Sequence, residues 1–207
     1  MEDKISTIKS WLGTGSINIF GLPMSGKDTQ GLKLAELLGA KLLSSGDIIR
    51  KKEAATRHDY SAKGNLIPTD VFYAWVLPYF KEPALKDMPL ILSSIGRWSG
   101  EETEVMNATT SAGHEIKAAI LLNVSEADVE SRFEAAKILN DRGTRADDRD
   151  VEIFHNRLKE FREKTLPVIT HYRNLGLLIS INGDQPRDAV TAEIVDQLYA
   201  KASQSLA

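Results

Sequence analysis

The segment 21–30, GLPMSGKDTQ, constrains the fold of this chain more than any other part of its sequence. A glycine is followed after four residues by Gly26-Lys27, with an apolar run at 17–20 before it and a helical pattern at 32–38 after it. Glycines permit backbone angles closed to other residues, so the loop amides can point inward at phosphate oxygens, helped by the positive end of the helix dipole. Lys27 adds a full positive charge. The sequence therefore predicts a strand, a phosphate-binding loop and a helix in succession.

Apolar runs typical of buried strands alternate with helical patterns along most of the chain. We expect strands at 17–20, 40–43, 89–92, 116–124 and 177–181, and helices at 3–12, about 69–80, 100–110, 126–138, 150–174 and 187–201. Strands that alternate with helices pair in parallel and carry helices on both faces, which predicts an α/β fold. Two polar stretches, 47–68 and 137–149, interrupt the alternation and are expected to be insertions that close over a substrate.

The composition excludes several classes of function. There is no cysteine, which removes disulfides, thiolate catalysis and cysteine-bound zinc together. The formal net charge of −3 argues against general nucleic-acid binding by charge. No apolar run approaches the roughly 20 residues that span a bilayer, and the first 15 residues lack the pattern of a signal peptide. We therefore expect a cytoplasmic protein that acts on a small molecule, with neither nucleic acid nor membrane as partner.

Two further motifs follow predicted strands. The motif Ser45-Gly-Asp-Ile-Ile-Arg50 comes after the second strand, and Ser45 or Asp47 is expected to cap a helix there. Arg50 would then lie one turn into that helix, where it could bind an anion. On its own, this pattern is more typical of an ordinary capped helix with a solvated arginine. Arg97 follows the third strand, and ligands of parallel sheets bind at the carboxyl ends of the strands. Arg97 and Lys27 are therefore expected to face one crevice.

An arginine-rich run extends from the predicted helix at 126–138 into the predicted helix at 150–174. It contains Arg132, Arg142, Arg145, Arg149 and Arg157, with Asp147 and Asp148 among them. A charge run is usually a solvated helix face. Phosphoryl transfer, however, needs positive charge around the migrating group, and a planar guanidinium holds two of its oxygens. Part of this run is therefore a candidate for contacts to phosphate.

Together and in this order, the motifs resemble those of the adenylate kinase family of nucleoside monophosphate (NMP) kinases, from about Ile17 to the C-terminus. The family's Gly-x-Pro-Gly-x-Gly-Lys-Gly-Thr-Gln, Ser/Thr-Gly-Asp-x-x-Arg, Gly-x-Leu-Val-Pro and Arg-x-Asp-Asp are met by residues 21–30, 45–50, 64–68 and 145–148. The resemblance implies a P-loop NTPase-like three-layer fold with a five-stranded parallel sheet. It also implies one kinase domain over 1–207, with an NMP-binding insertion at 45–75, a short zinc-free lid at 136–149 and an N-terminal helical extension at 1–14.

The resemblance also implies roles for particular residues. ATP would be bound by Met24, Ser25, Gly26, Lys27, Asp28 and Thr29 at its phosphates and by Arg132 and Gln185 at its adenine. The acceptor would be held by Ser45, Arg50, Asn65, Ile67, Ser94, Arg97 and Glu101. The catalytic residues would be Lys27, Arg50, Arg97, Arg145 and Arg157, with Mg²⁺ held largely through phosphates and water. The family favours a monomer.

One departure from the family affects the metal. The family's Asp-Gly-Phe-Pro-Arg is Ser93-Ser-Ile-Gly-Arg97 here, which lacks the aspartate that helps to order the water shell of the metal. Asp28 stands where the family has glycine, directly beside Lys27. We predict that Asp28 compensates for the missing aspartate by holding the metal through water.

A second departure affects the base. The family carries glutamine four residues after the strand-end arginine, where it both donates to and accepts from adenine. Here that position is Glu101, and an ionised carboxylate only accepts hydrogen bonds. It can pair with the amino group of adenine or cytosine, or with two neighbouring donors of guanine. We therefore predict weaker discrimination for AMP, or another base, unless Glu101 faces solvent and the backbone reads the base.

The reaction implied is reversible transfer of a phosphoryl group from ATP to an NMP, with AMP the acceptor expected from the family. Two alternatives stay open. The first is a kinase for GMP, CMP, UMP or dTMP, which Glu101 and a shortened insertion would suit. The second is a nucleotide-binding protein with weak turnover, which the missing aspartate at Ser93 would suit. The retained lysine and arginines favour catalysis.

Overall fold

The structure is a computed structural model that describes residues 2–139 and 150–206. Its five strands are β1 (Ser16–Gly21), β2 (Lys41–Ser44), β3 (Leu90–Ser93), β4 (Ile116–Asn123) and β5 (Leu178–Asn182). They form one parallel sheet in the order β2-β3-β1-β4-β5. The predicted α/β fold with a five-stranded parallel sheet is confirmed. Each predicted strand end differs from the observed one by no more than one residue, because buried apolar runs mark strands well.

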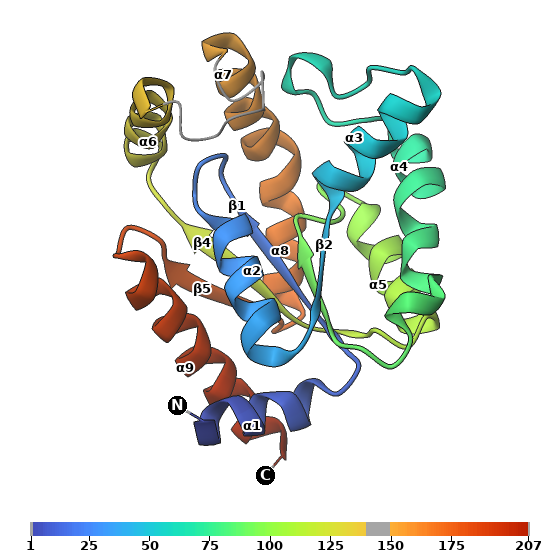
Figure 1. The fold of residues 1–207 in the computed structure, drawn as a ribbon, viewed down its shortest axis with the longest axis vertical. Helices are drawn as coiled ribbons and strands as arrows, with labels where there is room; N and C mark the ends of the chain where they lie inside the picture. The colour runs from blue at the N-terminus through green and yellow to red at the C-terminus, as the bar shows by residue number, and fades with distance from the viewer. Residues whose placement is uncertain (1, 140–149, 207) are drawn as a thin grey trace.

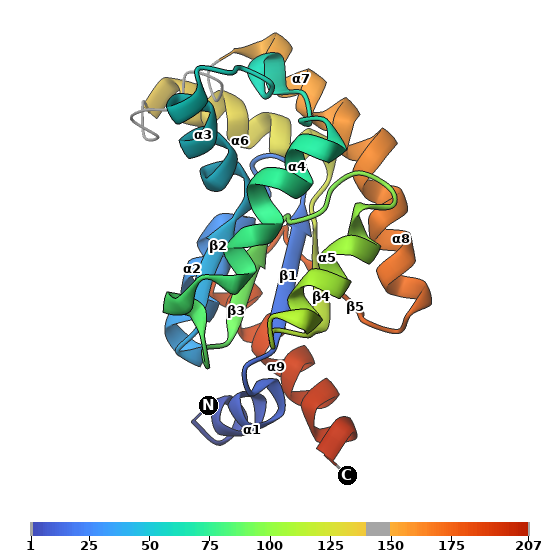
Figure 2. The ribbon, with the colours of Figure 1, turned by 90° about the vertical axis from the view of Figure 1, so that its right-hand side faces the viewer.

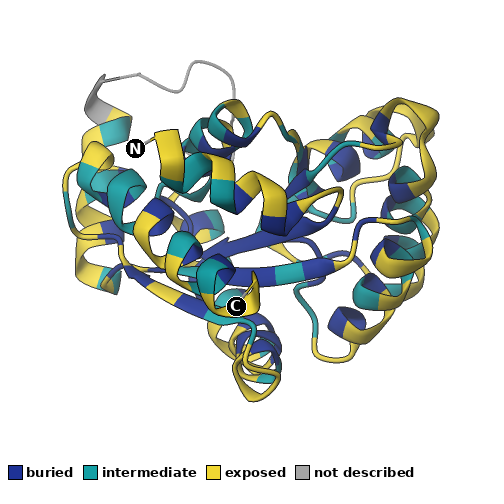
Figure 3. Ribbon diagram, turned by 90° about the horizontal axis from the view of Figure 1, so that it is seen from below, coloured by how far each residue is buried: buried dark blue, intermediate teal, exposed yellow. Residues whose placement is uncertain are grey.

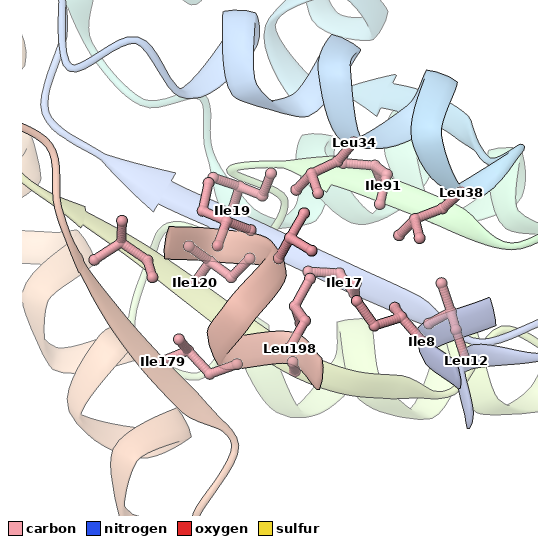
Figure 4. Packing of buried hydrophobic residues seen from close by; sticks show 14 of the residues in the cluster. Ile8, Leu12, Ile17, Ile19, Leu34, Leu38, Ile91, Ile120, Ile179 and Leu198 are labelled. Carbon is pink, nitrogen blue, oxygen red and sulfur yellow. The ribbon is translucent and has the colours of Figure 1, made fainter. Parts of the chain in front are cut away.

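Helices cover both faces of the sheet (Figure 1). One face packs against α1 (Glu2–Leu12), α2 (Lys27–Leu38) and α9 (Arg187–Leu206). Figure 4 shows this core, in which Ile17 and Ile19 of β1 meet Leu34 of α2 and Leu198 of α9. The opposite face packs against α3 (Ser45–Thr56), α4 (Thr69–Val76), α5 (Glu101–Ser111) and α8 (Leu166–Asn174). Figure 3 shows the result, dark buried strands between helices whose outer sides are exposed.

A third, smaller core lies above the sheet. It joins α6 (Glu126–Leu139) and α7 (Val151–Glu160) to the loop that follows β1. Phe133 and Phe154 stack with ring centroids 4.2 Å apart, and Met24 of the loop is buried in the same cluster. The two helices that flank residues 140–149 therefore rest on the loop itself.

Two predicted helices are interrupted, and each interruption lies next to a proline. The expected helix at 150–174 consists of α7, a π turn at Phe161–Thr165 and then α8. Pro167 lacks an N–H and crowds the carbonyl four residues before it, which a regular helix could not accommodate. The expected helix at 69–80 ends as α4 at Val76, and a 3₁₀ turn at Leu77–Lys81 with Pro78 follows.

The end of the molecule opposite the loops carries α1 and the C-terminal half of α9, which lie side by side (Figure 2). Lys4 of α1 pairs with Asp196 of α9 at 2.8 Å, and Lys117 Nζ donates to the carbonyl oxygen of Trp11. Short 3₁₀ turns at Ala62–Gly64 (η1) and Pro83–Leu85 (η3) complete the connections. Within the described residues, no helix combines the length and apolar character needed to cross a membrane.

Candidate active site

The loop between β1 and α2 has the geometry of an anion cradle. Gly26 has φ of 90°, a left-handed conformation that favours glycine, and a Cβ there would point into open space. Because α2 begins at Lys27, its first amides have no intrahelical acceptor and face outward from the helix end. The buried Ser25 hydroxyl has no hydrogen-bond partner among the described residues. These donors fit a chain of phosphates.

Residues from six helices, strands and turns, and from the loops between them, meet in one crevice beside the loop, which we call the arginine crevice. It is lined by Lys27, Asp28, Ser44, Ser45, Gly46, Ile49, Arg50, Ser61, Gly64, Asn65, Ile67, Ser93, Ser94, Arg97 and Arg157. Nine residues in this lining were singled out from the sequence: Lys27, Asp28, Ser45, Arg50, Asn65, Ile67, Ser94, Arg97 and Arg157. They come from the start of α2, the first half of α3, the segment after η1, the loop after β3, and α7.

Hydrogen bonds between side chains and backbone shape the floor of the arginine crevice. Ser93 Oγ donates to Asp28 Oδ1 at 2.6 Å, so the serine at the strand end holds the carboxylate beside the phosphate loop. Ser45 Oγ donates to the carbonyl oxygen of Ser94 at 2.8 Å. Arg50 forms an ion pair with Asp47 on the same helix. The helix cap is Ser44, whose Oγ accepts from the Asp47 amide, so the prediction of a cap at Ser45 or Asp47 is wrong.

The arginine crevice concentrates positive charge, and burial removes part of the water that would solvate it. Burial of the guanidinium, followed by the nearby charge of Arg157, lowers the pKa of Arg97 to about 10. Three carboxylates, Glu101, Glu160 and Asp28, act in the opposite direction. Arg97 therefore remains protonated at neutral pH, yet its charge is poorly solvated. A phosphate that enters the crevice would replace the missing water, which is the condition for strong anion binding.

Glu101 is buried, with only 4% of its surface exposed, so the alternative in which it faces solvent is wrong. Its Oε1 accepts from Thr69 Oγ1 at 2.9 Å, and its Oε2 accepts from the amides of Arg97 and Trp98 at 3.0 Å each. Burial is the main reason that the pKa of Glu101 is raised, while these three donors act against the rise. Glu101 also lines a small apolar pocket next to the arginine crevice, with Ile67 and Phe72.

A second pocket, which we call the helix pocket, lies on the other side of the phosphate loop. It is lined by Met24, Ser25, Gly26, Thr29, Gln30, Arg132, Ala135, Ala136, Gly183, Gln185, Pro186, Arg187 and Val190. Arg132 donates to the carbonyl oxygen of Gly183 at 2.9 Å and lies 3.4 Å from that of Ser25. Gln185 Nε2 donates to the Asn182 carbonyl oxygen at 3.0 Å and also to Glu193. The predicted residues at the ATP adenine, Arg132 and Gln185, thus share this pocket with the loop.

Part of the predicted site lies outside the described residues. This applies to Arg142, Arg145, Asp147, Asp148 and Arg149, and to all of the predicted lid at 136–149 except residues 136–139, which continue α6. Within the described part of the chain, no three His, Asp or Glu side chains gather as a metal cluster. The oxygen groups beside the phosphate loop, Asp28 and Ser93, instead fit a Mg²⁺ ion that is held mostly by phosphates and water.

Several residues around the arginine crevice were not predicted from the sequence as part of the site. Glu160 accepts from the Leu66 amide, Thr165 donates to the carbonyl oxygen of Arg97, and Asn156 donates to Asn65. Pro167 within a predicted helix was the one local signal that could have drawn attention to this stretch. The other contacts join segments far apart in the chain, and no local pattern reveals them.

Comparisons with known proteins agree with this geometry. A family model described as an AAA domain matches residues 20–154, so most of the chain belongs to that domain family. An adenylate kinase from Agrobacterium fabrum is 30% identical over 191 residues, which cover 88% of this chain and 96% of the relative. The chain belongs to the adenylate kinase family. Adenylate kinases of Parvibaculum lavamentivorans and Mycobacterium bovis are each 29% identical, covering 85% and 91% of this chain and 88% and 97% of the relatives.

Membership of the adenylate kinase family gives the arrangement a chemical meaning. The fold is that of a P-loop NTPase, and the chain is a phosphotransferase of the nucleoside monophosphate kinase type. The two pockets meet at the phosphate loop, whose residues line both of them.

Proposed function

We propose that the chain catalyses ATP + NMP ⇌ ADP + NDP, with AMP as its main acceptor. The observation that carries the proposal is that one phosphate loop lines both pockets: Met24 to Gly26 face the helix pocket, and Lys27 and Asp28 face the arginine crevice. ATP bound in the helix pocket would extend its phosphates along the loop toward the crevice. An NMP bound in the crevice would meet them there.

Catalysis would consist of positioning and charge neutralisation. An oxygen of the acceptor phosphate forms the new bond to the γ-phosphorus, and the bond from that phosphorus to the β–γ bridging oxygen breaks. No general base is required, because the acceptor oxygen is already ionised near neutral pH. Lys27 would contact the β- and γ-phosphates of ATP, and Arg50 and Arg97 would hold the acceptor phosphate. Arg157 lines the same crevice and would contact the transferring group, as Arg145 would from outside the described residues.

Adenylate kinases act with Mg²⁺, and we include this ion in the proposal. Bound to the phosphates, it would neutralise part of their charge. Asp28 is the residue that would hold a water of its shell, and Ser93 would keep the Asp28 carboxylate in place through their 2.6 Å hydrogen bond. This arrangement relocates a carboxylate from the end of β3 to the start of α2 while keeping it in the same crevice.

The surroundings of Glu101 bear on the choice of base. A carboxylate offers about four acceptor positions. Two amides and the Thr69 hydroxyl already use three of them, two on Oε2 and one on Oε1. The remaining position suits one amino group, as adenine and cytosine present. It cannot accept hydrogen bonds from two guanine donors at once. This supports AMP as the main acceptor with CMP as its competitor, and weaker discrimination than a glutamine would provide.

The alternative is a nucleotide-binding protein with weak turnover, which the serine at position 93 favours. The contact between Ser93 and Asp28 weighs against it, because a carboxylate remains available in the crevice. We further propose that the protein acts as a monomer in the cytoplasm. The monomer is expected from the resemblance to the adenylate kinase family, and sedimentation at micromolar concentration checks it.

A coupled assay of ADP formation with ATP, Mg²⁺ and a panel of AMP, GMP, CMP, UMP and dTMP tests the function. We expect turnover with AMP, weaker turnover with CMP, and little with the other three. Equal weak rates for all five, or none above the ATPase background, would support the nucleotide-binding alternative instead. Rates highest with GMP would contradict the argument from Glu101 while leaving the kinase assignment intact.

A further inference from the structure

A buried carboxylate outside the predicted site joins several elements around the arginine crevice. Glu160, the last residue of α7, is only 8% exposed. Its Oε2 accepts from the backbone amide of Leu66 at 3.0 Å and from Lys164 Nζ at 2.7 Å. It also lines a small pocket together with Arg97 and Arg157. Burying a charge costs free energy unless it is paired, so these contacts suggest more than packing.

On one side of Glu160, the segment that follows α3 is docked on α7. Asn156 Nδ2 donates to the Lys63 carbonyl oxygen and to Asn65 Oδ1, at 2.8 Å in each case. Gly64 lies so close to α7 that a Cβ there would be 2.7 Å from Arg157 Cγ, and its φ is +77°. With the bond from the Leu66 amide, four consecutive residues are held against the helix that carries Arg157.

On the other side, the π turn reaches the loop that carries Arg97. Lys164 Nζ, paired with Glu160, lies 4.0 Å from the ring centroid of Trp98, a cation–π contact. Thr165 Oγ1 donates to the carbonyl oxygen of Arg97 at 3.1 Å. The π turn thus places two side chains against the strand-end loop, and such turns often occur at functional sites.

The charge of Glu160 also affects the arginines themselves. Arg157 lowers the pKa of Arg97, which means that the two cations repel each other across the crevice. Glu160 acts in the opposite direction, as Glu101 and Asp28 do. Without these carboxylates, two like charges in a partly dry crevice would tend to separate.

We propose that Glu160 is a positioning residue that assembles the acceptor site before the acceptor binds. It fixes the loop at Leu66 to α7, holds the loop at Arg97 through Lys164, and balances the charge of the two arginines. The inference rests on the proposed function, since it concerns how the same crevice receives an NMP. Glu160 itself would touch neither nucleotide.

The test measures AMP and ATP separately. AMP affinity is determined by calorimetry, and KM for each substrate by the coupled assay, in Glu160→Ala, Glu160→Gln and the wild type. Glu160→Ala should weaken AMP binding and raise its KM about tenfold, as expected for the loss of a charged hydrogen-bonded group, with KM for ATP within about twofold. Glu160→Gln keeps one acceptor oxygen and should fall between. Glu163→Gln, an exposed carboxylate on the same π turn, is the matched control and should behave as the wild type.

A merely structural role predicts a different pattern, in which the melting temperature and kcat fall and both KM values change together. That pattern, or AMP affinity within about twofold of the wild type in both Glu160 variants, overturns the proposal. Because affinity is measured without turnover, a wild type that binds AMP but forms no ADP would refute the proposed catalysis and not this inference.

Hydrogen exchange in the wild type provides a second measurement that needs no variant. If the acceptor site is assembled in advance, the Leu66 amide is protected from exchange before AMP is added, because Glu160 already accepts its hydrogen bond. A Leu66 amide that exchanges freely and becomes protected only with AMP contradicts the proposal.

Discussion

The two pockets that flank the phosphate loop are built in different ways. The arginine crevice is shaped by side chains that bond to one another or to distant backbone, among them Ser93 with Asp28 and Ser45 with the carbonyl oxygen of Ser94. In the helix pocket, the side chains of Gln30, Arg132 and Gln185 donate instead to backbone carbonyl oxygens. A site made of side chains can change its ligand by substitution more easily than one made of backbone. We therefore expect the choice of acceptor to vary in such chains more readily than the binding of ATP.

The largest effect is expected at the point that both pockets share. Lys27→Met removes the one positive side chain that the phosphate loop itself supplies. Turnover should fall by about a hundredfold or more, because this charge acts in a water-poor site where the transition state needs it. The coupled assay measures the loss, and circular dichroism checks the fold. Near-normal turnover in a folded variant would show that Lys27 of the phosphate loop is not needed for catalysis. The comparison of two pockets that meet at this loop would then have no functional basis.

A pair of substitutions separates the two pockets. Arg97→Ala should lower kcat/KM for AMP about a hundredfold and change KM for ATP less than about threefold, since Arg97 lines the arginine crevice and not the helix pocket. Arg132→Ala should do the reverse, raising KM for ATP about tenfold, because Arg132 belongs to the helix pocket alone. Steady-state kinetics with each substrate varied in turn measures both. Matching losses for the two nucleotides in either variant would show that the pockets do not act separately.

A smaller effect is expected where a carboxylate meets the metal. Asp28→Asn keeps a hydrogen-bond acceptor for Ser93 and removes the charge, so the Mg²⁺ concentration for half-maximal activity should rise severalfold, about tenfold at most. Ser93→Ala should shift it in the same direction but less. Titration of activity with Mg²⁺ and direct binding of Mn²⁺ with ATP measure the change. Unchanged metal dependence in both variants would leave Asp28 with no role toward the ion.

The smallest effect concerns the base and the pH dependence of stability. Glu101→Gln can keep its oxygen as the acceptor of the two amides, while its NH2 group would donate to Thr69 Oγ1 instead of accepting from it, and the charge is lost. We expect the ratio of AMP to CMP turnover to rise a few-fold. Burial raises the pKa of Glu101 in the folded chain, so the wild type binds this proton more tightly folded than unfolded. Its stability should therefore fall, relative to that of the variant, as pH rises from about 4 to 7.

Urea unfolding at several pH values measures this difference. If the difference in unfolding free energy between the wild type and Glu101→Gln stays constant across that range, burial of Glu101 has no energetic consequence for the folded protein.

Most of the fold could be predicted because its signals are local. Apolar runs mark the five strands, and the glycine loop with its flanking strand and helix marks the edge where ligands bind. The interruption of the long helix was not predicted, because the helical pattern continues on both sides of Pro167. The cap of α3 was placed one residue or more too late, since Ser44 and Ser45 are equally good candidates by composition.

The sequence predicts which residues form the site better than it predicts the partners that those residues contact. Lys27, Arg50 and Arg97 follow from motifs of a few residues each. The partners of Glu101 and Glu160 do not, because Thr69 lies 32 residues from Glu101 and Leu66 lies 94 residues from Glu160 in the chain. Only folding brings such pairs together, and a buried carboxylate has no pattern in sequence that separates it from an exposed one.

Met24 makes the phosphate loop part of a larger mechanical unit. Its φ of 64° is a conformation that costs a residue with a side chain about 1 to 3 kcal/mol, and its side chain is buried with Phe133 of α6 and Phe154 of α7. A glycine in this place would relax the backbone and release the helices. Because these side chains pack together, we expect a displacement of the loop by an arriving phosphate to shift α6 and α7 as well. Nucleotide occupancy of the loop should therefore be detectable as a change in the environment of Phe133 and Phe154, which line neither pocket.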